Sequence, residues 1–261
     1  MKSAKLLVLL SSFIFIAALG VRAEDERVES KVYEWKDLEV EKSETRERRH
    51  IFKGPTHGFE YLQVHSSTVE PGMAAHGAHT HEDREELIII KEGTMEHTIN
   101  GKSRILSPGS VTLALQGDSH GMRNVGDVQA TYYIIRWRTR GPRSSGNPDA
   151  KSFSVNWDDL DFKGSFKGGR RNLMRHPTGM LAEFEMHTTT LKEGMKSHDP
   201  HTHPEDEIIL VRYGEVEEMI DGKPHKAGPG SVIFLGSDVP HGIRNIGEGP
   251  CEYYAFKWFL P

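Results

Sequence analysis

Short apolar runs separated by glycine-rich turns dominate the hydrophobic pattern of this chain. The runs ELIII at 86–90 and EIILV at 207–211 are apolar apart from their first residue and rich in β-branched side chains. Asn100-Gly101 and Asp221-Gly222 are dipeptides that favour tight hairpin turns. Because strands spaced by roughly ten residues are typical of a sandwich or a closed barrel, and no long stretch has the helical period, we predict an all-β protein. Four further runs complete the expected strands: SVTLAL (110–115), SVIFLG (231–236), TYYIIRW (131–137) and EYYAFKW (252–258).

The same pattern occurs twice along the chain. The motif WKDL at 35–38 recurs as WDDL at 157–160, 122 positions later, and from Glu86 onward the offset is 121 because one residue is missing. Two long units indicate two domains rather than a solenoid. We therefore predict an N-terminal domain at 24–137 and a C-terminal domain at 153–261, joined by a linker at 138–152 that is rich in Gly, Ser and Pro.

The first 23 residues have the layout of a secretory signal peptide. Lys2 and Lys5 precede an apolar run at 6–20, and Val21-Arg22-Ala23 offers small residues for cleavage. The run is shorter than the ~20 apolar residues that a membrane-spanning helix needs. We expect an exported protein, periplasmic or secreted, that has no membrane association once the signal is removed.

Composition narrows the classes of partner. The formal net charge is −5 and no basic run is present, which argues against binding to nucleic acid or anionic lipid. The single cysteine, Cys251, lies in an expected strand, so we interpret it as a core residue and expect no disulfide within the chain. A homo-oligomer is compatible with the β-rich pattern, because sheet edges need covering.

Two clusters of histidines and acids carry the chemistry. HGAHTHEDREEL at 76–87 is nearly repeated by SHDPHTHPEDEI at 197–208. In an extended His79-Thr80-His81 segment both imidazoles face the same side, and an antiparallel return would place Glu86 opposite them. Imidazole and carboxylate ligands together suit a transition metal. The alternative is a patch of solvated surface residues, but a purely solvated arrangement would not be expected to recur in both halves.

On these motifs the chain resembles the cupin superfamily. HTHEDREELIIIKEG and HTHPEDEIILVRYG resemble the first cupin motif, and PGSVTLALQGDSHGMRN and PGSVIFLGSDVPHGIRN resemble the second. The resemblance covers nearly all of the mature chain as two cupin units, a bicupin, and implies two tandem jelly-roll barrels. Glu85 is a rival to Glu86 as a ligand, and we prefer Glu86 because its distance to Gly93 equals that from Glu207 to Gly214. The implied metal ligands are His79, His81, Glu86 and His120, and His201, His203, Glu207 and His241.

The ligand set leaves the metal and the reaction open. Mn and Fe fit an octahedral site with free positions, Ni or Co are possible, and Zn is less natural, with up to two ions per chain. The first hypothesis is a metal-dependent enzyme of dioxygenase or decarboxylase type that acts on a small organic acid, phenol or sugar derivative, with Glu86 and Glu207 as candidate proton-transfer groups. The second is a metal-bearing binding protein for sugars or organic acids. A storage bicupin is the third, and intact ligand sets count against it.

Two interpretations are open for several of the repeated residues. Gln63 and His65, with their counterparts Glu185 and His187, either contact the substrate beside the metal or belong to the barrel wall. Arg48-Arg49 and Arg170-Arg171 either hold a carboxylate substrate or form salt bridges, for which Asp37 and Asp159 are the expected partners. Asn124 and Asn245 either orient a histidine or belong to turns. His97 is matched by Glu218, which indicates that the two cavities differ. Tyr132, Tyr133 and Trp137 are expected in the core or at an interface.

Overall fold

The computed structural model describes residues 26–141 and 146–261, and the protein is nearly all β, as the sequence predicts. The helical elements of these two ranges are single 3₁₀ turns, η1 (Trp35–Asp37) and η2 (Trp157–Asp159). The predicted signal peptide lies outside the described residues. No helix of the described part is both long and apolar enough to cross a bilayer.

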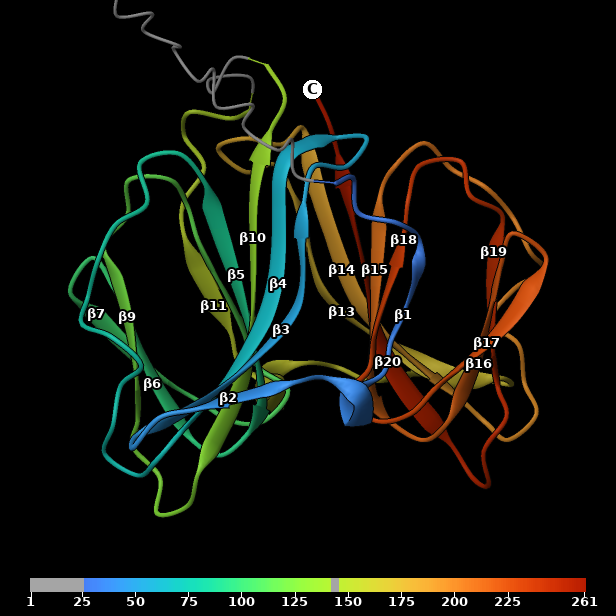
Figure 1. Ribbon diagram of the computed structural model, residues 1–261, viewed down its shortest axis with the longest axis horizontal. Coiled ribbons are helices and arrows are strands. Elements are labelled where there is room, and N and C mark those ends of the chain that lie inside the picture. Colours follow the sequence, from blue (N-terminus) through green and yellow to red (C-terminus); the bar gives the residue numbers. More distant parts are fainter. Residues whose placement is uncertain (1–25, 142–145) are drawn as a thin grey trace, which may run out of the picture.

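The N-terminal barrel pairs a seven-stranded antiparallel sheet with a three-stranded one (Figure 1). In spatial order the large sheet contains β11 (Phe153–Val155), β8 (Val111–Ala114), β5 (Glu85–Glu92), β10 (Ala130–Thr139), β4 (Phe59–Val69), β3 (Arg46–Gly54) and β2 (Val40–Lys42). The small sheet contains β7 (Lys102–Leu106), β6 (Met95–Ile99) and β9 (His120–Asn124).

The C-terminal barrel repeats this arrangement, so the chain folds as two tandem jelly-roll barrels. Its large sheet contains β1 (Lys31–Tyr33), β18 (Val232–Leu235), β15 (Glu207–Tyr213), β20 (Cys251–Phe259), β14 (Glu183–Leu191), β13 (Gly168–His176) and β12 (Lys163–Ser165). Its small sheet contains β17 (Lys223–Ala227), β16 (Val216–Ile220) and β19 (His241–Asn245).

Both predicted hairpin turns are present. Asn100 and Gly101 have φ angles of 47° and 75°, and Asp221 and Gly222 have 48° and 74°. Two successive positive φ angles are the signature of a type I′ turn, which matches the twist of the flanking strands and favours Asn-Gly and Asp-Gly. These turns join β6 to β7 and β16 to β17.

The two barrels exchange their first strands. β1 precedes the N-terminal barrel in the chain but pairs with β18 of the C-terminal barrel, Val32 lying opposite Ile233. β11 pairs in turn with β8 of the N-terminal barrel, Ser154 lying opposite Thr112. In Figure 1 the blue strand β1 lies among the orange strands, and the olive strand β11 lies beside the green ones. The predicted domain boundaries do not include this exchange.

The central apolar runs have no polar alternation because both faces of their strands are buried. In β5, Ile88 and Ile90 point into the N-terminal barrel, whereas Leu87 and Ile89 belong to a core shared by both barrels. Trp137 and Trp258 are almost completely buried in this shared core, and their ring centroids are 5.9 Å apart. The largest apolar cluster therefore lies between the barrels. Cys251 is a buried free thiol of the C-terminal barrel, as expected.

Candidate metal centres

Four side chains predicted as ligands converge inside the N-terminal barrel. His79 and His81 come from the loop after β4, Glu86 from β5 and His120 from the start of β9, and their ligand atoms all lie within 4.8 Å of one another. His81 Nε2 is 3.1 Å from both His79 Nε2 and Glu86 Oε2. His120 Nε2 is 3.4 Å from Glu86 Oε1. The four groups thus enclose one position that each can reach.

Backbone contacts orient the histidines toward this position. The backbones of His79 and His120 exchange two hydrogen bonds, of 3.0 and 2.9 Å, which fixes the loop against β9. His120 Nδ1 donates to the Asp118 carbonyl at 2.9 Å, and its buried Nε2 has no hydrogen-bond partner among the described residues. An imidazole held through Nδ1 with a free Nε2 is the usual arrangement of a metal-ligating histidine. The donor set of the N-terminal cluster therefore fits a transition metal ion.

The C-terminal barrel builds a similar cluster. His201, His203 and His241 lie within 4.8 Å of one another. Glu207 lies beside them, with its Oε2 2.8 Å from His203 Nε2 and 3.4 Å from His241 Nε2. His241 Nδ1 donates to the Val239 carbonyl at 2.8 Å, and its Nε2 has no partner in the described chain. This cluster is more open, because His201 is exposed whereas His79 is half-buried.

The carboxylates and imidazoles of each cluster shift one another's pKa values. Glu207 raises the pKa of His203, and Glu86 raises that of His120 against the effect of burial. Burial would raise the pKa of Glu86, but the close imidazoles of His120 and His81 and the charge of Arg136 lower it well below its usual range. Burial would likewise raise the pKa of Glu207, but the close imidazoles of His203 and His241 lower it. Burial and neighbouring imidazoles lower the pKa of His79 to about 4. Ionised carboxylates and neutral imidazoles are the forms that bind metals.

The structure separates Glu85 from its neighbour Glu86. Glu85 points away from the cluster, into the interface between the barrels, where its carboxylate accepts hydrogen bonds from Thr178 Oγ1 at 2.7 Å, Trp137 Nε1 at 3.0 Å and the Met180 N–H at 3.1 Å. Successive residues of a strand face opposite sides, so only one of the two can reach the histidines. That residue is Glu86, the one preferred from the sequence.

In each arginine pair, too, one residue borders a cavity and the other faces away from it. Arg48 borders the N-terminal cavity, whereas Arg49 faces outward, with its guanidinium 4.5 Å from the Trp35 ring and 3.6 Å from Glu47. In the second unit Arg170 borders the cavity, and Arg171 lies against the Trp157 ring and 3.3 Å from Glu252. The salt bridges of Arg49 and Arg171 are thus with Glu47 and Glu252 and not with the expected partners Asp37 and Asp159, and Asp159 pairs with Arg104.

A cavity opens beside each cluster. The N-terminal cavity has a volume of about 80 Å³ and is bordered by His65, His76 and His97 as well as the arginines. The C-terminal cavity has about 240 Å³ and is bordered by Glu185 and His187. Gln63 is buried but does not border the N-terminal cavity, and its amide oxygen accepts a hydrogen bond from Tyr61.

Asn124 and Asn245 belong to turns rather than to the clusters. The Asn124 amide donates to the carbonyls of Val69 and Val128, and its oxygen accepts from the Gly126 N–H. Asn245 makes the equivalent contacts in the second unit. Neither amide contacts a histidine of its cluster in the described structure. The two asparagines therefore belong to turns, which is the second of the two predicted roles.

Arg136 and Lys257 are cavity residues that sequence reasoning missed. Arg136 lies opposite Glu86 across β10 and β5 and forms an ion pair with it. Lys257 lies opposite Glu207 across β20 and β15. A signal was available, because a basic residue interrupts the apolar strands TYYIIRW and EYYAFKW at the same position in both halves.

Comparison with known protein families agrees with this geometry. The cupin domain family matches the chain twice, at residues 65–136 and 187–257. The protein belongs to the cupin family. Each match contains one of the two clusters, so this cupin is a bicupin, as its motifs indicate.

Solved structures share the two-barrel architecture of this cupin. Oxalate decarboxylase of Lactobacillus farciminis, in a complex with formate, superposes with a TM-score of 0.70 at 13% identity, covering 91% of this chain and 88% of that one. AerE of Microcystis aeruginosa has a TM-score of 0.67 at 14% identity, over 85% and 97% of the two chains. An oxalate decarboxylase variant of Bacillus subtilis has a TM-score of 0.68 at 13% identity, over 92% and 80%. At these identities the similarity concerns the fold.

Among curated proteins, the cupin matches one only over a short segment. A stretch of 46 residues is 33% identical to the HTH-type transcriptional activator RhaS of Mannheimia succiniciproducens, and it makes up 18% of this chain and 17% of that protein. The cupin thus matches less than a fifth of the length of this relative, and the match carries no argument about its activity.

Proposed function

We propose that this cupin is a metal-dependent enzyme of dioxygenase or decarboxylase type that acts on a small organic acid in the N-terminal cavity. The supporting observation is an excess of positive charge beside the candidate metal ligands. Arg46, Arg48 and Arg136 border the cavity, whereas Glu86 is the only acid among the described residues that border it. A carboxylate would neutralise this excess, because guanidinium groups bind carboxylates with two parallel hydrogen bonds.

Arg48 is the residue best placed to hold the acid. Its Nε is buried without a hydrogen-bond partner, and the described structure contains no ion pair for its guanidinium. Arg136 is instead committed to Glu86. His65 offers a further contact, because its buried Nδ1 is unpartnered and burial lowers the pKa of its imidazole to about 3, which keeps the ring neutral.

The metal would be held by His79, His81, Glu86 and His120, with Mn or Fe preferred for this mixed nitrogen and oxygen set. When bound, such an ion supplies Lewis-acid or redox chemistry to oxygen atoms of a substrate. The residues of the chain orient the acid and shield it from water, since the cavity is narrow and enclosed by Ile88 and Ile134. We further propose that residues 1–23 direct export, which N-terminal sequencing of the mature protein would test.

Metal analysis combined with turnover tests the proposal. Purified protein should contain up to two equivalents of Mn or Fe, and His81→Ala or His203→Ala should each remove about one, because each variant loses one imidazole ligand. Oxygen uptake and carbon dioxide release should be followed over a panel of small organic acids, sugars and phenols. Only His81→Ala is expected to abolish turnover of an acid.

Arg48→Gln is the matched test of substrate binding. It should leave the metal content unchanged and raise the KM for the acid by about tenfold or more, because a charge-assisted contact is lost. Full metal content in both histidine variants would refute the metal sites. Metal without turnover on any compound would favour a binding protein instead.

A further inference from the structure

The two cavities occupy matching positions of the repeat but have different sizes. Ile134 borders the N-terminal cavity, and Ala255 takes its place in the C-terminal cavity. Arg46 borders the first cavity, and its counterpart in the repeat is Gly168. Loss of these side chains accompanies the increase from about 80 to about 240 Å³. The C-terminal cavity therefore has room for a larger ligand.

The charge of the two cavities also differs. The C-terminal cavity has two basic residues, Arg170 and Lys257, against the three acids Glu185, Glu207 and Glu218. Arg170 is already paired with Glu185 at 2.9 Å, and Lys257 lies opposite Glu185 and Glu207 in the sheet. An incoming carboxylate would thus find no uncommitted guanidinium among these residues and would face an additional acid.

That additional acid, Glu218, is buried, and its carboxyl group lacks a hydrogen-bond donor in the described structure. Its side chain is completely buried on β16 at the cavity, and neither carboxylate oxygen has a hydrogen-bond partner within the described chain. Leaving such a group unsatisfied costs about 1–3 kcal/mol or more, and buried polar groups without partners require a specific explanation. A ligand that donates hydrogen bonds would supply the missing partner.

The matching position of the N-terminal unit is satisfied in part, because one ring nitrogen of His97 has a partner whereas its buried Nε2 has none in the described structure. His97 Nδ1 contacts Thr112 Oγ1 at 2.9 Å, and Thr112 donates in turn to the Phe153 carbonyl of the exchanged strand β11. The residue that matches Thr112 in the second unit is Ile233, which offers no such contact. Among the described residues, one polar atom at this position therefore has a partner in the first cavity, whereas neither carboxyl oxygen has one in the second.

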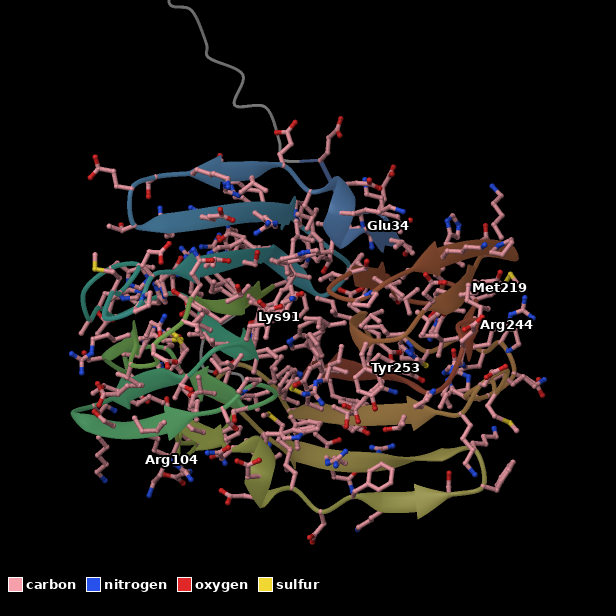
Figure 2. The ribbon with its side chains drawn as sticks, turned by 90° about the horizontal axis from the view of Figure 1, so that it is seen from below. Glu34, Lys91, Arg104, Met219, Arg244 and Tyr253 are labelled. Carbon is pink, nitrogen blue, oxygen red and sulfur yellow. The ribbon has the colours of Figure 1, made fainter. Side chains whose placement is uncertain are left out.

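Three hydroxyl side chains also border the C-terminal cavity. Thr189, Ser197 and Tyr253 border it, and Ser197 replaces Ala75 of the first unit. Figure 2 shows Tyr253 among the strands of this barrel, whereas Arg244 lies at its periphery. Hydroxyls both donate and accept hydrogen bonds, so they complement a ligand that carries hydroxyls of its own.

We propose that the C-terminal cavity is a second ligand site, which binds an uncharged polyhydroxylated molecule whose hydroxyl groups donate hydrogen bonds to Glu218. A carboxylate is disfavoured because Arg170, the guanidinium that borders this cavity, is already paired with Glu185, and an ammonium group would be repelled by Lys257 and by an ion held by His201, His203 and His241. This site does not depend on turnover in the N-terminal cavity, so its failure and that of the proposed enzyme activity are separate outcomes.

Three four-carbon probes distinguish the ligand classes. Erythritol is the uncharged polyol, succinate the dianion and putrescine the diamine, and binding of each to the zinc-loaded full chain would be followed by saturation-transfer NMR titration. We expect erythritol to bind at the C-terminal cavity. Glu218→Leu should weaken erythritol binding about tenfold, because the acceptor of the ligand's hydrogen bonds is removed. Ala255→Ile, which copies the first unit, should weaken it through loss of space.

Two controls separate ligand binding from a folding defect. Glu217→Gln changes a carboxylate on the same strand that pairs with Arg244 on the outside, and it should leave erythritol binding unchanged. The melting temperature of Glu218→Leu should equal or exceed that of the wild type, because an unpartnered buried acid is removed. The proposal is overturned if erythritol does not bind, if Glu218→Leu and Ala255→Ile bind it normally, or if succinate or putrescine displaces it from the C-terminal cavity.

Discussion

Adjacent residues of the repeat have different roles because they face opposite sides of their strand. Glu85 and Glu86 are adjacent acids, yet Glu85 crosses the interface to Thr178 and Glu86 contacts the histidines. Asp206 makes the same kind of contact as Glu85, accepting a hydrogen bond from Thr56 at 2.5 Å. One position of each acidic pair therefore binds the two barrels together, and the other belongs to the candidate metal centre.

Glu218 should make stability depend on pH. Burial, and then the charge of Glu207, raise the pKa of its carboxyl to about 8, while the Gly242 N–H, which does not reach hydrogen-bond geometry, lowers it slightly. The folded state thus binds the proton more tightly than the unfolded state, whose carboxyl keeps a pKa near 4.5. This contribution to stability is complete below pH 4.5 and is lost as the pH rises toward 8.

The measurement is urea unfolding of the metal-free protein between pH 4.5 and 8.5. Relative to Glu218→Gln, the wild type should lose about 4 kcal/mol of unfolding free energy across this range. Parallel pH profiles for the two proteins would show that the carboxyl titrates normally.

At the scale of elements, the exchanged strands and the 3₁₀ turns after them hold the barrels together. The Trp35 N–H donates to Ser231 Oγ at 3.1 Å, and the Trp157 N–H donates to Ser110 Oγ at 2.9 Å. Each indole covers a glycine of the other barrel, Gly230 or Gly109, where a Cβ atom would come within 3.0 Å of the ring. The repeated WKDL and WDDL motifs are therefore docking elements between the units.

Trp157→Ala should destabilise the protein by about 2–4 kcal/mol, because it empties the space over Gly109 and removes the ring that lies 3.7 Å from the Arg212 guanidinium. Denaturant unfolding measures this loss, and Trp157→Phe should restore part of it. Lys163→Ala, an exposed change on the edge strand β12, is the control and should have little effect. A Trp157→Ala protein as stable as this control would show that the motif does not dock the barrels.

At the scale of the whole molecule, the two barrels share one apolar core. The largest apolar cluster contains residues of both large sheets, and Tyr133 and Tyr254 each donate a hydrogen bond across the interface, to the carbonyls of Gly230 and Gly109 at 2.8 and 2.7 Å. Separating the barrels would expose this cluster and leave buried polar groups unpaired, which costs far more than a typical contact.

The barrels should therefore unfold together. Hydrogen exchange with increasing denaturant should give the same free energy of opening for β5 of the first barrel and β15 of the second, because each supports the shared core. Trp157→Ala should lower both values equally. Two separate transitions, or a decrease confined to one barrel, would contradict this coupling.

The sequence by itself determined the strands, the duplication and the two histidine clusters, because turns and side-chain alternation are local properties that neighbouring residues impose. Asn100-Gly101 specifies its turn, and His79-Thr80-His81 places two imidazoles on one side wherever the segment is extended. The cupin motifs extended this to the barrel and to His120, far along the chain.

Only the tertiary structure decided which strand pairs with which sheet, which arginine of each pair reaches a cavity, and how large each cavity is. Strand pairing uses backbone groups that every residue has, so the exchange of β1 and β11 leaves no mark in the local pattern. The hydroxyls and acids that border the C-terminal cavity likewise come from distant strands, and the replacement of Ile134 and Arg46 by Ala255 and Gly168 accompanies its larger volume.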